Sequence, residues 1–546
     1  MRPLLMTLFV PMMLVACGGD EKCVDGGCAS TSGVDEYGDD DDDDDDDDYS
    51  DGDDDDDDDW GGDADTDADA DADADADTDA DSDADTDADT DADTDADTGS
   101  TTTDTGGDSG LTETATDTGT GLCHDGELVE LWLSADDSNS MSSAALARDR
   151  VLSGRSAGAV RPYEFLNYYT FDYPAAPANE LAVTVEMLQD PSLPEGDYLL
   201  QIGVSSEART NEDRSPMNLV LSLDTSGSMG GTPIERSRDV CRDIASMLRP
   251  GDTVGAVTWS TNQSFLLDAH PIASANDPAL MAVCDGLQAN GGTDLNAGLV
   301  AAYGLANASY DPEKINRVLL LSDGGANAGV TDVNLIEQSS GQANEDGVYM
   351  VGVGVADGGS YNDHLMDQVT DAGKGAAVFL STAEESTKIF QDRFVNTFDV
   401  AARNVEVQLT LPPGFEIVTF SGEELSTNRD EVDPQHLAPN DAMVFHQVIR
   451  SCDPSGVVDT DTVGVHVEWQ DESSFQRRTV DASHSFGELL GGTPRRLHRA
   501  RAILAYTDAL VGEKTAAEAL DLLLVADAMY PGDPELAEIR SVLDEL

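Results

Sequence analysis

The stretch Asn218–Gly231, NLVLSLDTSGSMGG, indicates the fold of the central part of this chain. Its first six residues are almost entirely apolar, which is typical of a strand buried on both faces of a parallel sheet. An abrupt change to Asp, Ser, Thr and Gly follows, and Pro233–Leu248 then has a helical pattern with a proline at its start. The stretch therefore predicts a buried strand, a polar loop and a helix.

The same alternation continues along the chain. Short apolar segments predict further strands, and amphipathic segments predict helices between them. The predicted strands are Thr253–Trp259, Arg317–Ser322, Val348–Val355 and Ala376–Leu380. The predicted helices are Pro278–Leu287, Leu295–Ala308, Val330–Asp346, Asn362–Ala372 and Ala383–Phe398. We therefore expect an α/β domain over residues 216–398, a doubly wound, mostly parallel sheet covered by helices on both faces.

Polar oxygen atoms collect at the expected carboxyl edge of this sheet, where α/β proteins bind ligands. Asp224, Ser226 and Ser228 follow the first strand at every second position, so one turn can direct all three toward a common point. Thr293 lies in a Gly-Gly-Thr-Asp connection, and Asp323 ends the strand Arg317–Ser322. Hydroxyl and carboxylate oxygens suit Mg²⁺, Mn²⁺ or Ca²⁺ rather than zinc.

This order of motifs, Asp-x-Ser-x-Ser, then Thr, then Asp, resembles the metal-ion-dependent adhesion site (MIDAS) of von Willebrand factor type A domains. The resemblance implies that Ser226, Ser228 and Thr293 coordinate the metal directly. It implies that Asp224 and Asp323 act through water or as hydrogen-bond acceptors, and that a carboxylate of the partner fills an open position. Over about Leu128–His484 the layout also resembles a bacterial subfamily similar to the heavy chains of inter-alpha-trypsin inhibitors.

Other functions have weaker support. Ser228 lacks the glycine two residues earlier that a hydrolase nucleophile elbow needs, and no other constellation indicates an enzyme. Gly352-Val-Gly354 lacks the third glycine at the spacing of a dinucleotide loop. A metal-independent scaffold or assembly factor for an envelope complex remains the alternative to a module that binds a protein or polysaccharide.

The N-terminus indicates export. Met1–Ala16 has one Arg and an apolar run that is too short to span a bilayer, and it ends in Leu-Val-Ala before Cys17. This resembles a bacterial lipobox, in which Cys17 receives a lipid. With Gly18 after the cysteine, we expect a lipoprotein of the outer membrane of a Gram-negative bacterium, held to the membrane by its lipid only.

Residues 17–122 are expected to form a disordered acidic tether. They contain runs of ten Asp at 39–48 and seven Asp at 53–59, followed by Asp-Ala and Asp-Thr repeats. Such a segment buries nothing and repels itself, so it extends as a spacer. The net charge of −83 also argues against nucleic acid as a partner.

The remaining segments lie on both sides of the α/β domain. Residues 123–215 predict an N-terminal β-rich segment, 399–486 a β-sandwich-like domain, and 487–546 a group of helices. Apart from Cys17, six cysteines remain, which permits three disulfides in an exported protein. Cys241 and Cys284 fall on the helices beside the polar loops, and we expect them to form one of these disulfides.

Overall fold

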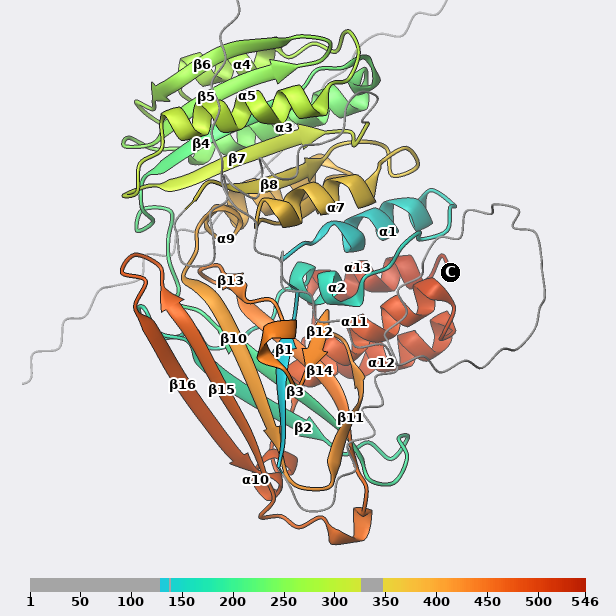
Figure 1. Ribbon diagram of the computed structural model, residues 1–546. Helices are drawn as coiled ribbons and strands as arrows, with labels where there is room; N and C mark the ends of the chain where they lie inside the picture. The colour runs from blue at the N-terminus through green and yellow to red at the C-terminus, as the bar shows by residue number, and fades with distance from the viewer. Residues whose placement is uncertain (1–127, 137–138, 326–346) are drawn as a thin grey trace, which may run out of the picture. The chain divides into compact units, whose positions relative to one another are not determined.

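The computed structural model describes residues 128–136, 139–325 and 347–546 (Figure 1). The expected signal peptide at 1–16, the lipidation site Cys17, the acidic tether at 17–122 and the predicted helix Val330–Asp346 lie outside the described residues. Within the described residues, no helix is both long enough and apolar enough to cross a membrane.

The α/β domain contains a six-stranded sheet in the order β6-β5-β4-β7-β8-β9. All neighbouring strands are parallel except β6, which runs antiparallel to β5. The central strands β4 and β7 are buried along their whole length, as their apolar sequences require. The strands are β4 (Met217–Asp224), β5 (Thr253–Trp259), β6 (Gln263–Pro271), β7 (Ile315–Ser322), β8 (Tyr349–Gly354) and β9 (Ala377–Phe379).

Helices alternate with these strands, and side chains before them cap several of their first turns. Asp277, Asp294, Asn362 and Thr382 each accept a hydrogen bond from a backbone N–H of the following helix. The helices are α3 (Thr232–Met247), α4 (Pro278–Gly286), α5 (Leu295–Ala308), α7 (Asp363–Ala372), α8 (Ala383–Thr387) and α9 (Phe394–Phe398). The predicted α/β fold of the domain is confirmed.

Two local expectations differ from the structure. The strand β6 was not predicted, because register shifts against β5 interrupt its alternation of polar and apolar residues. The single helix predicted over Ala383–Phe398 is divided into α8, a π-helical turn at Lys388–Asp392, and α9.

The two β-rich segments on either side of the α/β domain combine in shared sheets. One sheet has the order β12-β1-β10-β15-β16, with β13 also paired to β10, and the other has the order β11-β14-β3-β2. Strands β1 (Val129–Ser134), β2 (Ala182–Leu188) and β3 (Asp197–Ser205) come from before the α/β domain. The strands from after it are β10 (Ala402–Leu411), β11 (Phe415–Phe420), β12 (Glu424–Ser426), β13 (Gln435–Leu437), β14 (Ala442–Ser451), β15 (Thr462–Asp471) and β16 (Arg477–Ser485). The α/β domain is thus inserted between β3 and β10 of a single β-sandwich with its own hydrophobic core.

Helices from both ends of the described chain pack together. α1 (Ser142–Leu152) and α2 (Pro162–Tyr168) precede the α/β domain, and α10 (Phe486–Leu490), α11 (Arg495–Val511), α12 (Ala516–Met529) and α13 (Pro534–Leu543) follow the sandwich. Arg148 of α1 forms ion pairs with Glu385 of α8 and Glu538 of α13. One arginine therefore connects the N-terminal helices, the α/β domain and the C-terminal helices.

Candidate metal centre

The site begins where β4 ends, at the buried carboxylate of Asp224. Only 1% of this residue is exposed. The backbone N–H of Ser226 donates to its Oδ1 at 2.8 Å, and the Ser322 hydroxyl at the end of β7 donates to its Oδ2 at 2.8 Å. These bonds fix the carboxylate between the two central strands. The chain passes from β4 outward to β5 and back to β7, so this is the point where the strand order reverses, and such points favour ligand binding.

The two serine hydroxyls of the first loop lie together. A short 3-10 turn, η1 (Gly227–Met229), follows Ser226 and brings the Ser226 Oγ and the Ser228 Oγ to 3.0 Å from each other. Ser226 is fully buried, whereas Ser228 is exposed. The pair therefore presents two oxygen donors, one at the base of the site and one at its opening.

The loop that carries Thr293 is joined to the first loop by backbone hydrogen bonds. The Gly227 N–H donates to the Gly291 carbonyl at 3.0 Å, and the Asn290 N–H donates to the Thr225 carbonyl at 2.7 Å. A Cβ on Gly227 would lie only 3.1 Å from the Gly291 carbonyl oxygen, so glycine permits this close approach. Thr293 is 6% exposed.

The third loop follows β7. The Gly325 N–H donates to the Asp323 Oδ1 at 2.9 Å. A Cβ placed on Gly325 would lie 2.9 Å from that oxygen and 3.6 Å from the Ser228 Oγ. The Asp323 carboxylate and the Ser228 hydroxyl therefore border the same small space, which the absence of a side chain at Gly325 leaves open.

The donor set suits a hard divalent cation. Burial raises the pKa of Asp224 to about 6, and the charge of Asp323 acts in the same direction. A bound cation would favour the charged form of both carboxylates. Among the described residues, no group of three or more His, Cys, Asp or Glu side chains could hold a metal. A metal at this site therefore depends on the hydroxyl groups of Ser226, Ser228 and Thr293.

Two further polar residues that the sequence analysis did not select support these loops. Ser322 bonds to Asp224, as described above, and also accepts from the Gly324 N–H at 3.1 Å. The Thr261 hydroxyl accepts from the Gly292 N–H at 2.7 Å and so holds the Thr293 loop from outside. The sequence could have indicated Ser322, because it directly precedes Asp323. It could not have indicated Thr261, because the β5–β6 turn that carries this residue was not predicted.

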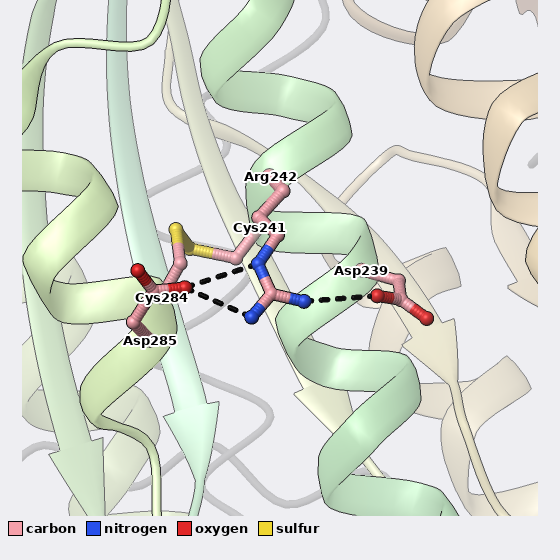
Figure 2. The surroundings of a disulfide bond; sticks show 5 residues. All are labelled: Asp239, Cys241, Arg242, Cys284 and Asp285. Atoms are coloured by element: carbon pink, nitrogen blue, oxygen red, sulfur yellow. Dashed lines mark hydrogen bonds and ion pairs between the residues drawn. A yellow bond between two sulfur atoms is a disulfide. The ribbon is translucent and has the colours of Figure 1, made fainter.

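A disulfide connects the helices that adjoin the first two loops (Figure 2). Cys241 of α3 and Cys284 of α4 are bonded, with their Cα atoms 5.4 Å apart. Arg242 donates to Asp285 at 2.8 Å beside the bond and to Asp239 at 3.1 Å on its own helix. The disulfide and the ion pair together fix α3 against α4.

Comparisons with known proteins agree with the α/β fold of this domain. Residues 218–393 match the family model of the von Willebrand factor type A domain. The chain is 28% identical over 266 residues to the uncharacterized protein YfbK of Escherichia coli strain K12, covering 47% of this chain and 46% of YfbK. It is 28% identical over 134 residues to human inter-alpha-trypsin inhibitor heavy chain H4, covering 23% of this chain and 14% of that protein.

Solved structures also include similar chains. A von Willebrand factor type A protein from Catenulispora acidiphila is 14% identical with a TM-score of 0.41, covering 64% of this chain and 87% of that one.

The fold and the family match identify residues 218–393 as a von Willebrand factor type A domain. The chain is homologous to YfbK and to the inter-alpha-trypsin inhibitor heavy chains, and it spans about half the length of the first two curated relatives that it matches.

Proposed function

We propose that this protein binds a macromolecular partner through a divalent cation held by Asp224, Ser226, Ser228, Thr293 and Asp323. Mg²⁺ fits best, and Mn²⁺ or Ca²⁺ are the alternatives. One observation carries the proposal. The hydroxyls of Ser226 and Ser228 lie 3.0 Å apart at the point where the strand order reverses, and the loops there also carry the carboxylates of Asp224 and Asp323. Type A domains commonly bind protein ligands, which supports a binding role.

The chemistry of the donor set explains why such a site would attract a partner. Three neutral hydroxyls as the direct ligands, with Asp224 and Asp323 acting through water or as hydrogen-bond acceptors, would leave a hard cation electrophilic, so that it can accept a carboxylate oxygen from outside. Ser228 is the exposed donor, so the partner would approach on its side. Under this proposal the site binds a partner, and no side chain is assigned to a covalent or proton-transfer step.

The proposed cellular context comes from the N-terminal sequence. Cys17 after a short apolar run supports a lipoprotein of the cell envelope, in the outer membrane of a Gram-negative bacterium. The acidic repeats would then hold the binding domain away from the lipid. Under this proposal the partner is a protein or polysaccharide that is accessible at the envelope.

Calorimetric titration of the full chain with Mg²⁺ tests the proposal. The acidic repeats condense cations loosely, so the comparison is between the wild type and the double variant S226A/S228A, which share the same repeats. We expect a saturable binding event that the double variant loses, while S541A, an exposed serine of α13, keeps it. Identical titrations of all three proteins up to several millimolar Mg²⁺ would favour a metal-independent scaffold instead.

A further inference from the structure

Two contacts between α3 and α4 lie about one helical turn apart. The first is the disulfide of Cys241 and Cys284 (Figure 2). The second is a hydrogen bond that the guanidinium of Arg238 donates to the carbonyl of Leu287, the residue directly after α4. Arg238 and Cys241 share a face of α3, because residues three apart in a helix are neighbours. The two contacts therefore form one line between antiparallel segments, which we call the α3–α4 seam.

The seam leads toward the candidate metal centre. Three residues beyond Leu287, the Asn290 N–H donates to the Thr225 carbonyl of the first loop at 2.7 Å. The next residue, Gly291, accepts from the Gly227 N–H at 3.0 Å. The disulfide, the arginine bond and these two backbone bonds follow one another in a single antiparallel order. The last of them are the bonds that join the two loops of the site.

The loop between α4 and α5 depends on contacts with its neighbours for its order. Residues 287–294 form neither helix nor strand, and they include Gly291 and Gly292, the residue type that loses most conformational entropy when it is fixed. Asp294 fixes the far end of the loop by accepting from the Ala297 N–H of α5 at 3.0 Å. At the near end, Arg238 supplies a donor and a positive charge, and the last carbonyls of a helix favour both. The seam thus fixes the end of the loop that follows α4.

We propose that the α3–α4 seam holds the Thr293 hydroxyl in position for the metal, so that Arg238 and the disulfide strengthen cation binding without contacting the ion. This inference rests on the proposed function and assigns positioning residues to its site. A loop that is already ordered loses less entropy when it closes on a cation, and the affinity rises accordingly. Thr293 is six residues beyond Leu287, within the segment that the seam fixes at its start.

Calorimetric titration of the full chain with Mg²⁺ separates positioning from stability. We expect R238M and C241A/C284A each to bind Mg²⁺ about tenfold more weakly than the wild type, at a temperature where circular dichroism shows both variants folded. R238K should keep most of the wild-type affinity, because its ammonium can still donate to the Leu287 carbonyl. Wild-type affinity in either R238M or C241A/C284A would overturn the inference.

Two control variants match these changes. E235A removes the exposed ion pair of the same arginine and should bind Mg²⁺ like the wild type. R148M removes the ion pairs of Arg148 with Glu385 and Glu538, neither of which belongs to a loop of the site. It should lower stability and leave the Mg²⁺ affinity unchanged. A loss of affinity in R148M equal to that in R238M would show that the effect is one of general stability, which contradicts a positioning role.

Amide hydrogen exchange of the metal-free protein tests the seam independently of metal binding. Relative to the amides of the central strand β4, peptides covering 287–294 should exchange at least tenfold faster in R238M and C241A/C284A than in the wild type and R148M. Unchanged exchange would show that the seam does not order the loop, and the inference would be wrong. Faster exchange together with the absence of any wild-type Mg²⁺ event in calorimetry would show that the seam orders the loop, but that the proposed function, and with it the metal role of the seam, fails.

Discussion

Gly325 shows how a single residue can keep a binding site open. Its position between the Asp323 Oδ1 and the Ser228 Oγ leaves space that a methyl group would occupy at 2.9 Å from the first atom and 3.6 Å from the second. Its backbone is not in the left-handed region that disfavours other residues. Substitution should therefore affect the site more than the fold.

We predict that G325A weakens Mg²⁺ binding about tenfold, which corresponds to about 1.4 kcal/mol. Calorimetric titration measures the affinity, and thermal unfolding should show a similar midpoint for G325A and the wild type. G304A is the control, because a methyl group at this exposed helical position meets nothing within 4 Å. Equal Mg²⁺ affinities of G325A and G304A would show that this space does not adjoin the metal.

A buried histidine of the sandwich should make stability depend on pH. Burial lowers the pKa of His446 from 6.5 to about 4, and the charge of Arg501 acts in the same direction. In the folded protein the ring also bonds to the Gln201 side chain at 3.0 Å. Because the unfolded chain takes up a proton at higher pH than the folded chain does, this contribution is fully present above pH 6.5 and is lost as pH falls toward 4.

The expected contribution of His446 to the loss of unfolding free energy between pH 7 and pH 4 is on the order of 3 kcal/mol. Urea unfolding at both pH values measures it, and H446Q should show a smaller loss than the wild type. H364Q changes an exposed histidine of α7 and serves as the control. If the loss between pH 7 and pH 4 is the same in all three proteins, His446 is not its source.

At the scale of the elements, the disulfide between α3 and α4 is a strong constraint. Cys241 and Cys284 are 43 residues apart in sequence, and closing a loop of that length restricts the unfolded chain by about 4 kcal/mol in the entropic account. A disulfide offers no thiol, so alkylating reagents should not modify either residue in the unreduced protein, even after it is unfolded in urea.

We therefore expect C241A/C284A to lower the free energy of unfolding by about 2–4 kcal/mol, as measured by urea unfolding. The variant D285A removes only the exposed ion pair with Arg242 and should change stability by less than about 1 kcal/mol. Wild-type stability in C241A/C284A, or rapid alkylation of both thiols in the native protein, would contradict this assignment.

The elements also show which features a sequence reveals and which it hides. The strands β4 and β7 were predictable because each contains an apolar run, Leu219–Leu221 and Val318–Leu321, and ends in Asp224 or Ser322. The strand β6 was not, because its pattern QSFLLDAHP combines two register shifts with exposed apolar residues. Likewise, spacing alone indicated that Asp224, Ser226 and Ser228 share a loop. It could not reveal that Ser322 and Thr261 hold the loops in place, since those contacts exist only in three dimensions.

At the scale of the whole molecule, Arg148 connects parts of the chain that are distant in sequence. It is 11% exposed and pairs with Glu385 of the α/β domain and with Glu538 of α13. Lys388 and Glu535 form a second connection between the same two regions at 3.2 Å. The sequence could not predict this arrangement, because periodicity identifies helices without showing which surfaces they contact.

We predict that R148M lowers the free energy of unfolding by about 3–5 kcal/mol, since it leaves Glu385 buried without its cation. Scanning calorimetry should show a lower midpoint, and α11–α13 should become more sensitive to proteolysis. R540M breaks only the half-exposed pair with Asp527 and should stay within about 1 kcal/mol of the wild type. Equal midpoints for R148M and R540M would mean that Arg148 does not hold the helices to the α/β domain.

Diffraction from crystals grown with Mn²⁺ tests the central claim most directly, because anomalous scattering locates the ion itself. We predict one anomalous peak within about 2.0–2.3 Å of the hydroxyl oxygens of Ser226, Ser228 and Thr293, with the carboxylates of Asp224 and Asp323 nearby. Ordered density for these side chains without an anomalous peak among them, at millimolar Mn²⁺, would contradict the assignment of a metal centre to this site.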